Sequence, residues 1–136
     1  MGLLDKTINK TKSTFNATTN KLGETKEVTK LESQIKDERN KVKGTYETIG
    51  KEYYRWTYDN DEEHKKTIDS LVAQINESRT LIEQYEAEIE EIRQKGKEER
   101  YNIKADADAK DKEIDAADEQ KRADKQREKK EKDDLF

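Results

Sequence analysis

Apolar residues recur at alternating steps of three and four along two stretches of this chain, which places each set on one face of an α-helix. The first stripe consists of Val28, Leu31, Ile35, Val42, Ile49 and Trp56, with Glu38, Thr45 and Glu52 at the intervening positions. The second stripe restarts the rhythm in a new frame and consists of His64, Ile68, Leu71, Ile75, Ser78, Ile82, Tyr85, Ile89 and Ile92, in which only His64 and Ser78 are polar. The chain has no proline that would interrupt either helix. The two stripes therefore predict two coiled-coil helices with a break between them.

The break falls at residues 59–61, whose sequence DND favours turns, and either Asn60 or Asp61 can cap the next helix. A connection this short favours antiparallel neighbours. If the helices fold back here, the numbers of two facing residues add to 120, and no layer then brings two charged residues together. The sequence thus predicts an all-α fold built around an antiparallel coiled-coil hairpin over residues 24–95.

Residues 1–23 are predicted to form a separate amphipathic segment with a net charge of +3, divided from the hairpin by Gly23. One face of this helix carries Leu4, Ile8, Thr11, Phe15, Thr18 and Leu22, with Leu3 beside them. Two interpretations are open: a third helix that covers the open seam of the hairpin, or a helix that lies on an anionic membrane surface. In the second, the candidate membrane contacts are Leu3, Leu4, Ile8, Phe15, Leu22, Lys6, Lys10 and Lys12.

Residues 96–136 form a charged tail with few large apolar side chains, so they cannot build a core of their own. Oppositely charged residues four apart, such as Asp106 and Lys110, support a helix weakly. We therefore expect a tail that is either a solvated helix or disordered.

Composition excludes several kinds of site. With no cysteine and a single histidine, the chain cannot form a cysteine-ligated or histidine-rich metal site, and we predict no catalytic residues, metal ligands or cofactor. A formal net charge of -4 argues against general nucleic-acid binding. Apolar runs of two or three residues are too short for a membrane span or a secretory signal. We expect a cytoplasmic protein without a small-molecule substrate, located at the inner face of the membrane if the amino segment binds lipid.

Residues 45–64 hold four of the six tyrosines, the only tryptophan and the only histidine. Two interpretations compete here as well: the rings pack the end of the hairpin, or some of them bind a partner. The candidate partner contacts are Tyr46, Tyr54 and Tyr58, because they lie off the predicted seam. His64, beside the turn, is expected to be a capping or edge residue.

The stretches "KLESQIKDERNKVKGTYETIGKEYY" and "EEHKKTIDSLVAQINESRTLIEQYEAEIEEIR" resemble small proteins of Gram-positive bacteria that carry a coiled-coil hairpin. The resemblance covers roughly residues 28–95 and rests on Tyr46, Ile49, Gly50 and the Tyr53–Tyr54 pair. It implies the hairpin fold and a bacterial cytoplasm. Members of that family commonly continue into a zinc ribbon with paired cysteines, which this sequence lacks, so the resemblance implies no metal here.

These observations predict a non-enzymatic coiled-coil scaffold that binds a protein partner or itself. The alternative is a peripheral membrane protein that uses the amphipathic amino segment.

Overall fold

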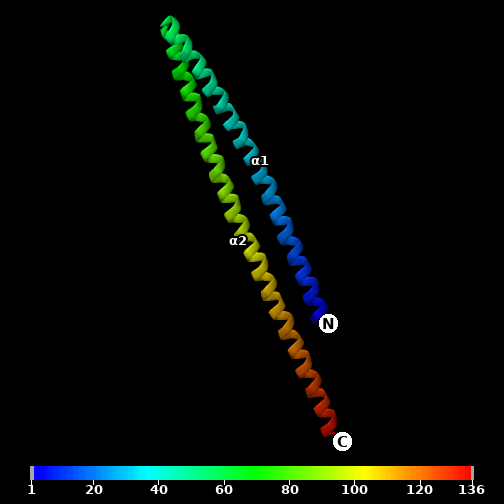
Figure 1. The fold of residues 1–136 in the computed structure, drawn as a ribbon. Helices are drawn as coiled ribbons and strands as arrows, with labels where there is room; N and C mark the ends of the chain where they lie inside the picture. The colour runs from blue at the N-terminus through cyan, green and yellow to red at the C-terminus, as the bar shows by residue number, and fades with distance from the viewer. Residues whose placement is uncertain (1, 136) are drawn as a thin grey trace. The chain divides into compact units, whose positions relative to one another are not determined.

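The computed structural model describes residues 2–135, and these form two helices joined by a tight turn (Figure 1). Helix α1 spans Gly2–Asp59 and helix α2 spans Glu62–Asp134. The described residues contain no strand, and the two helices pack against each other, so the predicted all-α helical hairpin is confirmed. The chain divides into two compact units, which we call the turn unit, residues 24–94, and the terminal unit, residues 1–23 together with 95–136.

The turn between the helices is fixed by local hydrogen bonds. Asn60 adopts a left-handed conformation with φ 54°, which asparagine tolerates better than most residues, and its N–H donates to the carbonyl of Trp56 at 2.9 Å. The Asp61 N–H donates to Oδ1 of Asp59 at 3.0 Å. Oδ1 of Asp61 in turn accepts from the Glu63 N–H at 3.1 Å, so Asp61 is the residue that caps α2.

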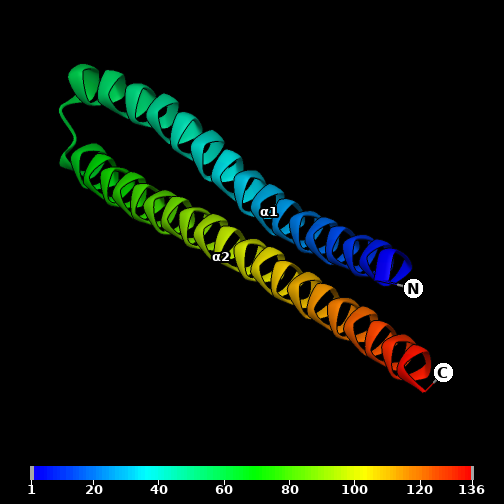
Figure 2. The ribbon, with the colours of Figure 1, turned by 90° about the horizontal axis from the view of Figure 1, so that it is seen from below.

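The core of the turn unit is a narrow apolar seam between antiparallel segments that lie side by side in both ribbon views (Figures 1 and 2). Val28, Ile35 and Ile89 form a buried cluster, and Ile75 is buried nearer the turn on α2. The partly buried residues packed against the cluster are Leu31, Ile82, Tyr85 and Ile92. All of these belong to the two stripes read from the sequence, yet no large side chain described is fully buried. The seam is therefore one layer thick and open to water along both sides.

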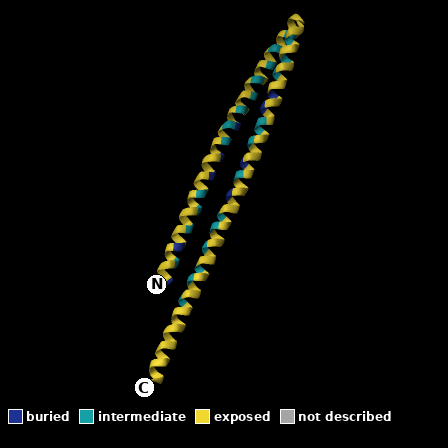
Figure 3. Cartoon of the chain, turned by 180° about the vertical axis from the view of Figure 1, so that it is seen from behind, coloured by how far each residue is buried: buried dark blue, intermediate teal, exposed yellow. Residues whose placement is uncertain are grey.

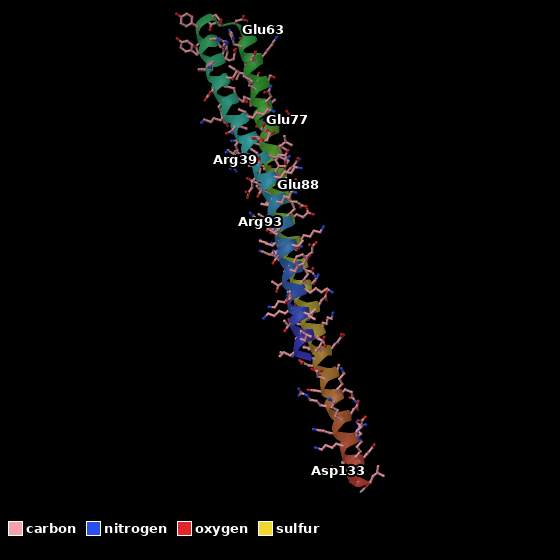
Figure 4. All side chains as sticks on the ribbon, turned by 90° about the vertical axis from the view of Figure 1, so that its right-hand side faces the viewer. Arg39, Glu63, Glu77, Glu88, Arg93 and Asp133 are labelled. Carbon is pink, nitrogen blue, oxygen red and sulfur yellow. The ribbon has the colours of Figure 1, made fainter. Side chains whose placement is uncertain are left out.

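Charged residues occupy the outer faces and edges of the turn unit. Arg39 pairs with Glu86 at 3.2 Å and Arg93 with Glu32 at 3.6 Å, so both pairs bridge the two helices. Other carboxylates, such as Glu77 on α2, are exposed to solvent (Figure 4). Exposed pairs of this kind contribute little to stability, which leaves the apolar seam as the main stabilising feature.

In the terminal unit, residues 2–23 of α1 pair with α2 through a polar interface. Asn9, which is only 7% exposed, donates from Nδ2 to the Ala107 carbonyl at 2.9 Å and to Oδ1 of Asp111 at 2.8 Å. Farther along, Arg100 donates to Oδ1 of Asn20 at 3.0 Å. Gly2, which has no side chain, leaves room for the carboxylate of Asp118. On the α1 side of this interface, polar and small residues therefore take the place that aliphatic ones occupy in the turn unit, whereas the α2 side keeps the half-buried Ile103 and Ile114.

Two sequence-based expectations need correction here. Gly23 does not interrupt the helix, because α1 continues through it, although the boundary between the two compact units does fall after this residue. The amino segment is likewise not a third helix over the hairpin seam, because it pairs with the α2 part of the terminal unit. Of the two options for the tail, the structure shows the helix, and residues 119–135 are exposed throughout (Figure 3).

Candidate functional site: an unpaired apolar stripe on α1

The most distinctive surface of the terminal unit is an apolar stripe on α1. We call it the amino stripe, and it consists of Leu3, Leu4, Ile8, Phe15 and Leu22. The side chains of these residues remain between 56% and 81% exposed. On a helix with 100° per residue, the centre of the stripe lies about 160° from the face that contacts α2. The pairing of the helices thus uses the polar face of this segment and leaves its apolar face without a neighbour among the described residues.

The lysines of the amino segment separate into two groups. Lys6 lies in the interhelical interface, where its Nζ pairs with Oδ1 of Asp115 at 2.5 Å, and the hydrogen bond that Lys6 donates to Asp115 raises the Lys6 pKa above its ordinary value. Lys10 and Lys12 are exposed. Lys10 also lines a shallow surface hollow together with Phe15 of the stripe. Of the three lysines predicted as membrane contacts, the structure places Lys10 and Lys12 on the outer surface and Lys6 on the opposite face.

The aromatic cluster near the turn divides in a similar way. Trp56 is half-buried in the seam, and the Tyr53 ring meets its edge at a centroid distance of 6.1 Å and an interplanar angle of 78°. Tyr54 and Tyr58 are 67% and 82% exposed, with their ring centroids 6.1 Å apart. Tyr46 is also exposed, and its hydroxyl accepts a long hydrogen bond of 3.5 Å from Arg79. Packing in the seam therefore accounts for Trp56, whereas Tyr53 contacts it but stays 56% exposed, and Tyr54 and Tyr58 form an exposed ring pair.

His64 joins the two helices beside the turn. Its Nδ1 lies 2.7 Å from Oε2 of Glu52, and its Nε2 lies 2.9 Å from Oδ2 of Asp59. Because ionised carboxylates only accept hydrogen bonds, both contacts are hydrogen bonds at the same time only when the imidazole is protonated. The bonds to Glu52 and then to Asp59 raise the His64 pKa. The His64 bond is the main cause that lowers the Glu52 pKa, whereas the Asp59 pKa is lowered first by the Asp61 backbone N–H and then by His64.

We call the contacts of His64 with Glu52 and Asp59 the His64 clasp. These contacts join the two helices, whereas the sequence predicted only a capping or edge residue at this position. The pairing rule placed His64 opposite Trp56 and placed Glu52 opposite Ile68, one turn away. The long glutamate side chain spans that turn, a contact that residue numbers alone do not reveal. Both ring nitrogens contact carboxylates, so this histidine links Glu52 and Asp59 of α1 to the first turn of α2.

Residues 2–135 contain neither a candidate metal site nor a candidate membrane span. These residues contain no group of three or more His, Cys, Asp or Glu arranged to hold a metal ion. Neither helix contains a stretch that is both long and apolar enough to cross a bilayer. Comparison with family models, with curated proteins and with solved structures found no match. The resemblance to the Gram-positive hairpin proteins thus stays a prediction, and the surfaces described above are the basis for a functional proposal.

Proposed function

We propose that this protein is a non-enzymatic interaction protein, a paired-helix scaffold whose main contact surface is the amino stripe. The observation that carries this proposal is the orientation of residues 2–23. Their polar face packs on α2 through Asn9 and Asn20, whereas the stripe, including Phe15 at 69% exposure, faces away. Contiguous exposed apolar patches on proteins commonly mark binding surfaces.

The spacing of the stripe supports a contact role. Positions 4, 8, 11, 15, 18 and 22 alternate by four and three residues, as in a coiled-coil seam, although α2 occupies a different face. A helix that only needed to pair with α2 would have no use for this second, apolar face. The stripe therefore provides one continuous surface for a helix of a partner, a second copy of the chain or a lipid surface.

The exposed ring pair of Tyr54 and Tyr58 is a further contact candidate within the turn unit. Tyrosine is favoured at binding surfaces because it offers a large rigid ring and a hydrogen-bonding hydroxyl. These two rings contact each other and leave most of their surface open to solvent. We assign them a supporting role, because two rings offer less continuous apolar surface than the stripe.

Site-specific photocrosslinking tests whether the stripe is occupied. A photoreactive phenylalanine would replace Phe15 in cells that produce the full chain, and the matched control would replace Tyr101, an aromatic residue that is 73% exposed in the same unit. We expect adducts at position 15 in clear excess over position 101, with mass spectrometry identifying what is attached. Equal or absent adducts at the two positions would overturn the proposed function.

A further inference from the structure

We propose that the occupant of the amino stripe is the surface of an anionic lipid bilayer, on which residues 2–23 lie flat. This inference rests on the proposed function and names the partner of the same surface. It commits to a lipid surface rather than to a partner helix or a second copy of the chain. Four features of the terminal unit carry it: the sign of the charge, the polar residues beside the stripe, the face to which α2 binds, and the apolar length of the segment.

The charge of the amino segment is opposite to that of the rest of the protein. Residues 1–23 carry a net +3, and because the whole chain carries -4, the remaining residues carry -7. Asp5 is the single acidic residue in the segment. Lys6 is paired with Asp115 on the opposite face, so Lys10 and Lys12 are the exposed lysines nearest the stripe. A helix that combines an apolar stripe with exposed lysines, on an acidic protein, matches the requirements of an anionic membrane surface.

The same charges disfavour a second copy as the occupant. Stripe-to-stripe pairing of two chains would bring Lys10 and Lys12 of one copy near the corresponding lysines of the other. Coiled coils that associate through such a seam place opposite charges at its edges, where they set the partner and its orientation. Here the edges offer mainly lysine and uncharged threonine, with only Asp5 to compensate.

The polar residues beside the stripe suit the boundary between headgroups and acyl chains. Thr7, Thr11, Thr14 and Thr18 carry hydroxyls but no charge. The Thr7 hydroxyl already donates to the Leu3 carbonyl at 2.9 Å, so it can approach an apolar phase without losing its hydrogen bond. Carboxylates, which an anionic surface would repel, are nearly absent from this part of α1.

Binding through the stripe also leaves the terminal unit intact. Asn9 contacts Ala107 and Asp111, and Lys6 contacts Asp115, all on the face opposite the stripe. In this orientation α1 would lie between the bilayer and the acidic stretch of α2. The segment has no apolar stretch able to cross the membrane, so it would bind along the surface.

Vesicle flotation of the full chain tests the inference. Vesicles would contain phosphatidylcholine alone or mixed with phosphatidylglycerol, at physiological and at high salt. The variants are Phe15→Ser on the stripe, Tyr101→Ser as a matched exposed aromatic, and the charge reversal Lys10→Glu/Lys12→Glu. Circular dichroism establishes that each variant keeps its helicity, as expected for substitutions at exposed positions.

We expect the wild-type chain and Tyr101→Ser to float with anionic vesicles and not with phosphatidylcholine alone. Phe15→Ser should lower the partition coefficient by roughly tenfold or more, since one buried aromatic ring is lost. The charge reversal and high salt should each reduce binding as well, because both weaken attraction to the headgroups.

Other outcomes distinguish a failure of the proposed contact function from a failure of the lipid assignment alone. Binding that is independent of anionic lipid, or equal for Phe15→Ser and the wild type, overturns the assignment to an anionic surface. If nothing floats but light scattering shows oligomers that Phe15→Ser abolishes, the occupant is a second copy and the proposed function stands. If nothing floats, the mass is unchanged and position 15 gives no adducts in cells, both proposals fall.

Discussion

Replacing Ile89 by alanine tests whether the apolar seam of the turn unit holds this protein together. Ile89 is 7% exposed and belongs to the buried cluster with Val28 and Ile35. Because only two helices form the seam, each buried aliphatic residue represents a large share of the apolar contact. The loss of a single side chain should therefore be felt throughout the turn unit.

The magnitude follows from the atoms removed. Isoleucine to alanine deletes three carbons, which at about 0.8 kcal/mol per buried CH₂ gives a transfer loss of roughly 2.4 kcal/mol. A cavity adds to this loss in a closed core, where such changes cost about 2 to 5 kcal/mol. The seam is open to solvent along both sides, so water and neighbouring side chains can fill the gap. We therefore expect unfolding to become easier by roughly 2 to 3 kcal/mol, near the lower end of that range.

Urea denaturation followed by circular dichroism measures this change, and Val72→Ala is the matched control. Val72 is also an aliphatic residue of α2 but is 43% exposed, so its truncation should cost less than about 0.5 kcal/mol. Both substitutions introduce alanine into a helix and gain a similar helix propensity, which largely cancels in the comparison. A difference between the two variants below about 1 kcal/mol would refute the conclusion that the seam dominates stability.

Three further predictions concern particular side chains of the turn unit. The His64 pKa is raised in the folded protein, so protonated His64 stabilises the fold fully below about pH 6.5, the ordinary histidine pKa. This stabilisation is lost as the pH rises through the folded-state pKa of His64, and the urea midpoint of the wild type should therefore fall toward alkaline pH. His64→Gln should flatten this dependence, and a wild-type midpoint that stays constant from about pH 6 to pH 9 would contradict the clasp with Glu52. Oε2 of Glu38 is buried without a hydrogen-bond partner among the described residues. Glu38→Leu should therefore stabilise the protein by roughly 1 to 3 kcal/mol in the same urea denaturation assay, and a destabilised variant would contradict the cost assigned to this buried carboxylate. Alanine at Tyr54 and Tyr58 should change stability by less than about 0.5 kcal/mol each, and a larger loss in thermal unfolding would show that these exposed rings pack the turn.

The turn unit was predictable because one physical signal dominates it. Apolar residues at heptad spacing, such as Ile35 and Ile89, indicate both which face is buried and which residue lies opposite. The pairing in the terminal unit was missed because the α1 side of its interface carries no such signal. Asn9 and Asn20 look like surface residues, and the apolar stripe of this segment lies on the side of the helix away from α2. The facing numbers of Asn9 and Asp111 still add to 120, so the pairing rule, extended beyond Val28, would have found the contact.

The break that the sequence suggested at Gly23 is a change in the apolar pattern rather than a break in the helix. Leu22 and Val28 are six residues apart, a step that does not continue the alternation of three and four. Six residues turn an α-helix by about 600°, so Val28 lies roughly 240° around the axis from Leu22. One uninterrupted helix therefore carries two apolar faces in succession. In the turn unit α2 covers the face that begins at Val28, and the polar contacts of Asn9 show that α2 does not cover the face from Leu4 to Leu22. The face from Leu4 to Leu22 therefore stays open to solvent, and this exposed apolar surface is the basis on which we propose that the protein makes its contacts at its amino end.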